Sequence, residues 1–145
     1  NFNDIEAIIR PLGLSKTKAN NVKEIAHILL KKYNGVVPQN KEELMKLPGV
    51  GNKTANVVLI ELFKIPAFPV DTHVYRTSKR LNLASEEDDV LEVENKLKNI
   101  FHKSSWIKLH HQFIHFGRYY CKAVSPKCES CKLKGICKYY EYQKI

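Results

Sequence analysis

The 145-residue chain lacks the features that mark membrane, fibrous and disulfide-rich proteins. No apolar run approaches the roughly 20 residues that a membrane-spanning helix needs, and residues 1–10 do not resemble a signal peptide. Six glycines, six prolines, 43% hydrophobic and 27% charged residues exclude a collagen-like or disordered chain. The absence of an initiator methionine favours a fragment or a processed product. We expect a soluble intracellular protein with no membrane association.

Acidic residues are scarce relative to basic ones. Lys and Arg number 24 against 15 Asp and Glu, which gives a net charge of +9. Six of the acidic residues fall in residues 86–94, where we expect them on the solvent face of a helix. The strongly basic remainder favours a polyanionic partner, nucleic acid before an anionic membrane surface. A lysine-rich surface that serves only solubility is the alternative.

The sequence also has no extended alternation of polar and apolar residues, and its apolar residues recur at helical spacing. We therefore predict an all-α fold, with a long helix over about residues 52–64 and another over about residues 71–81. The predicted N-caps are Ser15 or Thr17, Asn40 with Glu43 in a capping box, Asp71, and Ser104 or Ser105. The predicted inner face of the acidic helix comprises Val90, Val93, Leu97 and Ile100.

Cysteine is absent from residues 1–120, and the four cysteines are Cys121, Cys128, Cys131 and Cys137. Such short loops can bring four thiolates around one metal centre, whereas two disulfides are disfavoured without a secretory signal. The spacing identifies the ligands but leaves zinc and an iron–sulfur cluster open. The surrounding basic residues, which include Arg118, Lys122 and Lys132, suit contacts with a phosphate backbone. Alternatively, they offset the charge of the thiolate centre.

A glycine-containing turn, Pro48-Gly49-Val50-Gly51, separates two predicted helices. Glycine permits positive φ and a close approach of another backbone, and the amides at the start of the next helix suit a phosphate. The pattern is typical of a helix-hairpin-helix, with an ordinary interhelical turn as the alternative. We expect contacts with DNA from Leu47, Pro48, Gly49, Val50, Gly51 and Thr54.

Two residues near this turn have the chemistry of a catalytic pair. Lys53 lies in the first turn of a predicted helix, where the helix dipole disfavours the ammonium form and so favours an amine nucleophile. A lysine that contacts phosphate or solvent is the alternative. Asp71 is a predicted N-cap, and a carboxylate held in this way can also stabilise positive charge on a sugar. The three histidines of the last long helix, His110, His111 and His115, are expected to be core or surface residues rather than ligands.

Three segments together resemble the endonuclease III family: residues 47–59 (LPGVGNKTANVVL), 70–76 (VDTHVYR) and 115–121 (HFGRYYC). The cysteine spacing also matches that family's [4Fe–4S] loop, and the resemblance covers essentially the whole chain. It implies the helix-hairpin-helix DNA glycosylase fold in two helical lobes. Residues 1–66 would form the barrel lobe, incomplete at its N-terminus, and residues 67–145 the lobe that carries the cluster loop at 121–137.

The resemblance further implies a base-excision-repair DNA glycosylase with abasic-site lyase activity on oxidised pyrimidines. Lys53 would be the Schiff-base nucleophile and Asp71 its carboxylate partner, and the four cysteines would bind the cluster. The implied partner is duplex DNA that contains damaged bases or abasic sites. The implied setting is a monomer in the cytoplasm of a prokaryote, at the nucleoid. A non-catalytic iron–sulfur or zinc module that only binds DNA is the alternative.

Overall fold

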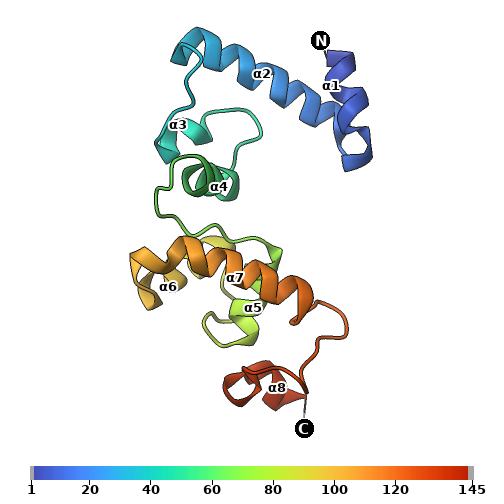
Figure 1. The fold of residues 1–145 in the computed structure, drawn as a ribbon, viewed down its shortest axis with the longest axis vertical. Coiled ribbons are helices and arrows are strands. Elements are labelled where there is room, and N and C mark those ends of the chain that lie inside the picture. Colours follow the sequence, from blue (N-terminus) through green and yellow to red (C-terminus); the bar gives the residue numbers. More distant parts are fainter. Residues whose placement is uncertain (1, 144–145) are drawn as a thin grey trace. The chain divides into compact units, whose positions relative to one another are not determined.

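The computed structural model describes residues 2–143 and contains no β-strand over that range (Figure 1). The elements are α1 (Phe2–Ile9), η1 (Arg10–Leu12), α2 (Ser15–Tyr33), α3 (Lys41–Met45), α4 (Asn52–Leu62), α5 (Thr72–Arg80), α6 (Val90–Ile100), η2 (Lys103–Ser105), α7 (Trp106–Tyr119), η3 (Lys134–Ile136) and α8 (Lys138–Tyr142), the η elements being 3₁₀ helices. The prediction of an all-α fold is confirmed. No helix in the described range is long and apolar enough to cross a membrane.

The chain divides into two compact units, Asn1–Leu59 and Ile60–Ile145. The boundary between them falls inside α4, whereas the sequence predicted a division at residues 66 and 67. Buried apolar residues occur in both units, and the predicted functional residues are distributed over both. Lys53 belongs to the first unit, while Asp71 and the four cysteines belong to the second.

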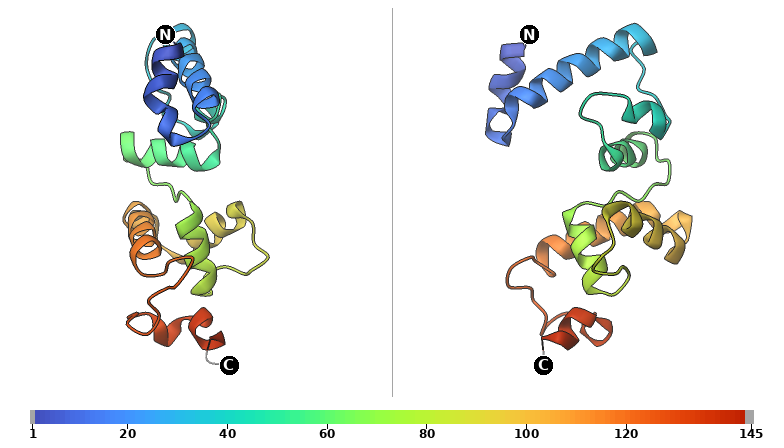
Figure 2. Two further views of the ribbon diagram at one scale, coloured as in Figure 1. Left: turned by 90° about the vertical axis from the view of Figure 1, so that its right-hand side faces the viewer. Right: turned by 180° about the vertical axis from the view of Figure 1, so that it is seen from behind.

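In the first unit, α1 folds back beside α2 (Figures 1 and 2). The predicted caps Ser15 and Thr17 are wrong, because α2 begins at Ser15 and Leu14 occupies the cap position in the left-handed conformation. The Ser15 hydroxyl instead donates to Glu6 of α1 over 3.1 Å. A side chain expected to cap one helix therefore joins two.

The predicted capping box of α3 forms in part. The Asn40 side chain accepts from the Glu43 amide over 2.7 Å, as predicted. The Glu43 carboxylate, however, contacts Lys46, Tyr33 and Lys32. These three side chains lower the pKa of Glu43 to about 2. Lys46 at the end of α3 and the two donors from α2 thus draw the carboxylate away from the cap that the sequence pattern suggested.

The core of the second unit lies between α5, α6, α7 and the connector that precedes α5. Phe68 of the connector packs edge-on against Phe113 of α7, with ring centroids 6.2 Å apart. Helices α5 and α7 approach closely at Gly117, where a Cβ atom would lie 2.8 Å from Cβ of His73. Glycine at this position therefore allows the two helices to pack at this distance.

The predictions for the helix ends in this unit are confirmed only in part. Val93 and Leu97 are fully buried in α6 as expected, but Val90 and Ile100 are 45% and 51% exposed because they lie at the ends of the helix. Helix α7 begins at Trp106 without a side-chain cap. Ser105 occupies the N-cap position as predicted but makes no capping hydrogen bond, and Ser104 lies in the 3₁₀ turn that precedes the helix.

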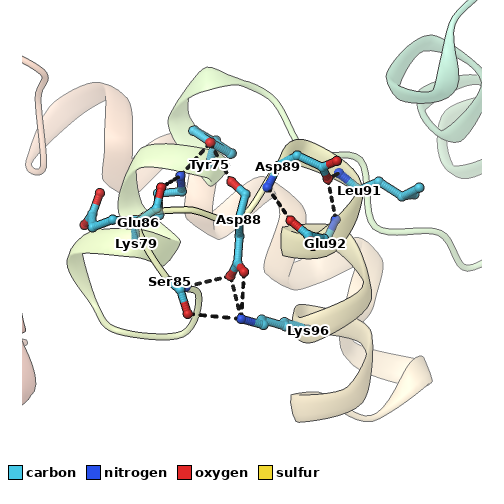
Figure 3. A network of polar contacts seen from close by, with 9 residues as sticks. All are labelled: Tyr75, Lys79, Ser85, Glu86, Asp88, Asp89, Leu91, Glu92 and Lys96. Carbon is cyan, nitrogen blue, oxygen red and sulfur yellow. Dashed lines mark hydrogen bonds and ion pairs between the residues drawn. The ribbon is translucent and has the colours of Figure 1, made fainter.

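The acidic segment is only partly the solvent face that the sequence predicted. Asp88 is 9% exposed and Glu94 is 1% exposed. Asp88 accepts from Lys96 over 2.7 and 2.8 Å and from the Ser85 amide over 2.6 Å (Figure 3). Glu94 forms an ion pair with Lys98 on the next helical turn. Burial of a carboxylate is tolerated here because a lysine neutralises it.

The same segment also supplies the start of α6. The Asp89 side chain accepts from the amides of Leu91 and Glu92, and the Asp89 amide donates to the Glu92 carboxylate to complete a capping box (Figure 3). The phenol of Tyr75 donates to the Asp88 carbonyl over 2.7 Å. The acidic residues thus fix the α5–α6 connection.

We predict that Asp88→Asn destabilises the protein at neutral pH more than at acid pH. Lys96 and the Ser85 amide hold the pKa of Asp88 below its ordinary value. The stabilisation is therefore present above about pH 4 and is lost as pH falls through the lowered pKa of the folded state. Urea unfolding of both proteins across this range measures the difference, with the exposed Glu87→Gln as control. A difference that does not shrink in acid would contradict the assignment.

Candidate functional site

The hairpin between α3 and α4 is a tight backbone turn. The Val50 amide donates to the Leu47 carbonyl over 3.1 Å, and the Gly51 carbonyl accepts the first helical bond of α4, from Ala55, over 2.9 Å. The side chain of Leu47 is buried and belongs to the interior of the unit. Pro48 and Val50 are half-buried. The burial of these apolar side chains thus fixes the turn to the rest of the unit.

The two glycines of the hairpin differ in their surroundings. Gly49 has φ +73°, and a Cβ atom there would lie 2.2 Å from the side-chain nitrogen of Asn21. At Gly51 a Cβ atom would meet nothing within 4 Å, and φ is not positive. The fold therefore requires glycine at position 49 and does not require it at position 51.

Lys53 and Thr54 occupy the first turn of α4, and both side chains are exposed. At the start of a helix the first amides have no partners within the helix and carry the positive end of its dipole. An anion can bind there without displacing any internal hydrogen bond. The hairpin therefore combines an anion-binding helix start with an accessible amine.

Asp71 caps α5, as the sequence predicted. Its Oδ1 accepts from the amides of His73 and Val74 over 2.9 and 2.8 Å. Because both bonds use the same oxygen, Oδ2 is not needed for the cap. The carboxylate is held by the backbone and half-buried, and its second oxygen is available for chemistry.

The four cysteines border one cavity, which is partly open to solvent. Its other walls include Leu81, Phe116, Tyr120 and Tyr139. Burial raises the pKa of the Cys128 thiol, and the nearby Cys121 and Cys137 raise it further. The Leu133 amide donates to Sγ of Cys131 over 3.4 Å. All four residues that the sequence selected as ligands thus border the same cavity, although no three potential ligands in the described range are grouped closely enough to hold a metal ion.

Two arginines of α5 hold the start of the cysteine loop. Arg76 donates to the carbonyls of Gly117, over 2.8 Å, and Cys121, over 3.0 and 3.1 Å. Arg80 donates to the Lys122 carbonyl over 2.7 Å and to Sγ of Cys121 over 3.4 Å. Neither arginine was predicted as a functional residue. Their spacing of four residues on one predicted helix was the available signal, but it did not reveal their partners.

The predicted basic contacts lie around this loop. Arg118, in the last turn of α7, and Lys122 and Lys132, in the loop, are all exposed. The backbone carbonyl of Lys122 is engaged by Arg80, so its backbone is fixed while its ammonium group remains at the surface. These side chains are therefore available to a polyanion.

Comparison with known proteins identifies the family. A profile described as HhH-GPD superfamily base excision DNA repair protein matches residues 1–103. The chain therefore belongs to the HhH-GPD superfamily of base excision DNA repair proteins. This finding confirms the resemblance that the three sequence segments suggested.

Among individual relatives, Endonuclease III of Bacillus subtilis is 46% identical over 135 residues, which are 93% of this chain and 62% of that protein. Endonuclease III of Escherichia coli is 40% identical over 137 residues, covering 94% and 64%. The chain thus spans less than two thirds of the length of these relatives.

Solved structures agree. A non-covalent Endonuclease III–DNA complex superposes with a TM-score of 0.96 at 49% identity, covering 99% of this chain and 67% of that one. A trapped Endonuclease III–DNA covalent intermediate gives a TM-score of 0.96 at 48% identity, covering 100% and 68%.

The two hairpin glycines give a matched pair of substitutions. We predict that Gly49→Ala costs about 1–2 kcal/mol, because alanine is strained at positive φ and its Cβ atom collides with Asn21. Gly51→Ala should change stability by less than about 0.5 kcal/mol. Chemical denaturation of both variants measures the difference. Equal losses of stability in the two variants would contradict this prediction, because the fold would then require glycine at position 51 as well.

Proposed function

We propose that the protein is a base-excision-repair DNA glycosylase with abasic-site lyase activity that removes oxidised pyrimidines from duplex DNA. The observation that carries the proposal is Lys53, an exposed amine in the first turn of α4 directly after the glycine hairpin. A relative 48% identical to this chain has been trapped as a covalent intermediate with DNA. An amine nucleophile accounts for such an adduct.

The damaged nucleotide must first leave the base stack, at a cost of a few kcal/mol that damage reduces. The Lys53 amine then attacks C1′, a C–N bond forms, and the bond to the base breaks with its electron pair on the base. Asp71 stabilises the positive charge that develops on the sugar. The half-buried carboxylate, fixed through Oδ1, supports this role because its orientation is set before the substrate binds.

The sugar ring opens to give an imine between Lys53 and C1′. The imine acidifies the C2′ proton, and its removal expels the 3′ phosphate with the bonding electrons, which breaks the strand by β-elimination. Water then hydrolyses the imine and regenerates the amine. One lysine thus accounts for both removal of the base and cleavage of the strand.

DNA would be held by the hairpin and by the basic loop. The exposed Gly51 and Thr54 at the start of α4 suit a phosphate group, and Arg118, Lys122 and Lys132 suit further phosphates along the strand. Duplex DNA as the partner is supported by the solved complex of a relative. We further propose a monomer that acts in the prokaryotic cytoplasm, at the nucleoid, and the bacterial relatives support the prokaryotic setting.

A [4Fe–4S] cluster is part of the same proposal. The composition of the cavity supports this part of the proposal, because four thiols border it and a backbone amide and a guanidinium donate to two of the sulfurs. Cys121, Cys128, Cys131 and Cys137 would hold the cluster through their thiolates. When bound, it supplies a cross-link that orders the loop and its lysines.

Lys53→Ala should abolish covalent trapping by borohydride on a duplex that holds one abasic site. Binding to the same duplex should fall by less than about threefold, because a single phosphate contact accounts for only a small part of the affinity. Lys23→Ala, which removes an exposed lysine from α2, is the matched control. A trapped adduct that persists in Lys53→Ala would exclude this nucleophile. Wild-type protein that binds but never traps would favour the non-catalytic alternative.

Metal analysis of the protein purified without oxygen should find iron and acid-labile sulfide in equal amounts. Cys128→Ser should lower both, because the cluster loses one of its four ligands. Ser130→Ala, a substitution within the same loop, is the control. Zinc without sulfide would overturn the cluster assignment and favour the zinc module.

A further inference from the structure

A buried histidine lies outside the proposed chemistry. His110 of α7 is 3% exposed, and its Nδ1 lies 2.8 Å from the Pro69 carbonyl. A carbonyl oxygen only accepts hydrogen bonds, so Nδ1 carries the proton and donates. A buried imidazole placed in this way is a fixed donor to the main chain.

The acceptor lies in the connector between α4 and α5. Residues 67–70 of this connector are buried but form neither helix nor strand. A buried carbonyl outside regular structure needs a partner from elsewhere, and His110 supplies one to Pro69. Phe68 is held by Phe113, which lies three residues after His110 on α7. One face of α7 thus fixes the connector through a hydrogen bond and a ring contact.

This connector leads directly to Asp71. Pro69 and Asp71 are two residues apart, so at most about 7 Å of chain separates them. A displacement of the backbone at Pro69 therefore also displaces the backbone at Asp71. On its other side the Asp71 carboxylate is fixed by the amides of α5. The helix cap thus fixes the Asp71 carboxylate, and His110 fixes the backbone that precedes it.

We propose that His110 is a positioning residue for Asp71, acting through the Pro69 carbonyl. The proposal rests on the catalytic role proposed above for Asp71. His110 itself would touch neither DNA nor the reacting atoms. Its loss would let the connector move, and a misplacement of about 1 Å is enough to cost roughly 100-fold in rate.

The neighbouring His111 provides a matched control. It pairs with Glu61 over 3.3 Å, its ring packs edge-on against that of His110, and both partners of the pair are about half exposed. Exposed pairs of this kind contribute little to stability. His111→Phe therefore removes an adjacent imidazole from α7 without removing the donor to the connector.

The experiment measures single-turnover base excision with His110→Phe, His110→Asn and His111→Phe, each alone and combined with Asp71→Asn. We expect His110→Phe to lower the rate by about 10- to 100-fold with the KM for duplex DNA unchanged. His110→Asn should recover most of the loss, because its amide nitrogen can replace the Nδ1 donor. His111→Phe should change the rate by less than twofold.

The double variants separate positioning from a general structural role. If His110 acts through Asp71, His110→Phe should cause no further loss in the Asp71→Asn background. An equal loss in both backgrounds, or no recovery in His110→Asn, would overturn the proposal while leaving the function intact. If Asp71→Asn alone does not slow excision, the catalytic role of Asp71 and the proposal both fail.

Discussion

The second unit depends on two guanidinium groups that project from one face of α5. A helix ends with carbonyl groups that have no partner within the helix, and Arg76 satisfies that of Gly117 at the end of α7. It also binds the Cys121 carbonyl, and Arg80 binds the next carbonyl. The position of the first cysteine is therefore set by contacts with α5, which is 41–45 residues earlier in the sequence. The loop, the basic side chains on it and the cavity all follow from this attachment.

Local patterns predicted most of the fold and of the candidate site. Helical spacing identified the all-α class, and the cap at Asp71 was confirmed because capping depends only on a residue and the two amides that follow it. The cysteine spacing selected four thiols that do border one cavity. The family followed from three segments and was confirmed by the profile match.

Long-range contacts explain the failures. Ser15 was a reasonable cap by its position, but Glu6 of another helix takes its hydroxyl. Asp88 and Glu94 were indistinguishable in sequence from their exposed acidic neighbours, because burial depends on how α6 packs. The arginines of α5 and the buried His110 have their partners more than 40 residues away. No local pattern encodes such pairs.

Two independent requirements limit which residues can replace Asp71. Alanine would remove the cap and cost about 1 kcal/mol of stability, quite apart from any chemistry. Asparagine would retain the oxygen that accepts from His73 and Val74, but it would put an amide where the second carboxylate oxygen lies. A lineage that lost the need for the reaction would therefore still be selected to keep a short polar residue here, and aspartate rather than asparagine would be the trace of catalysis.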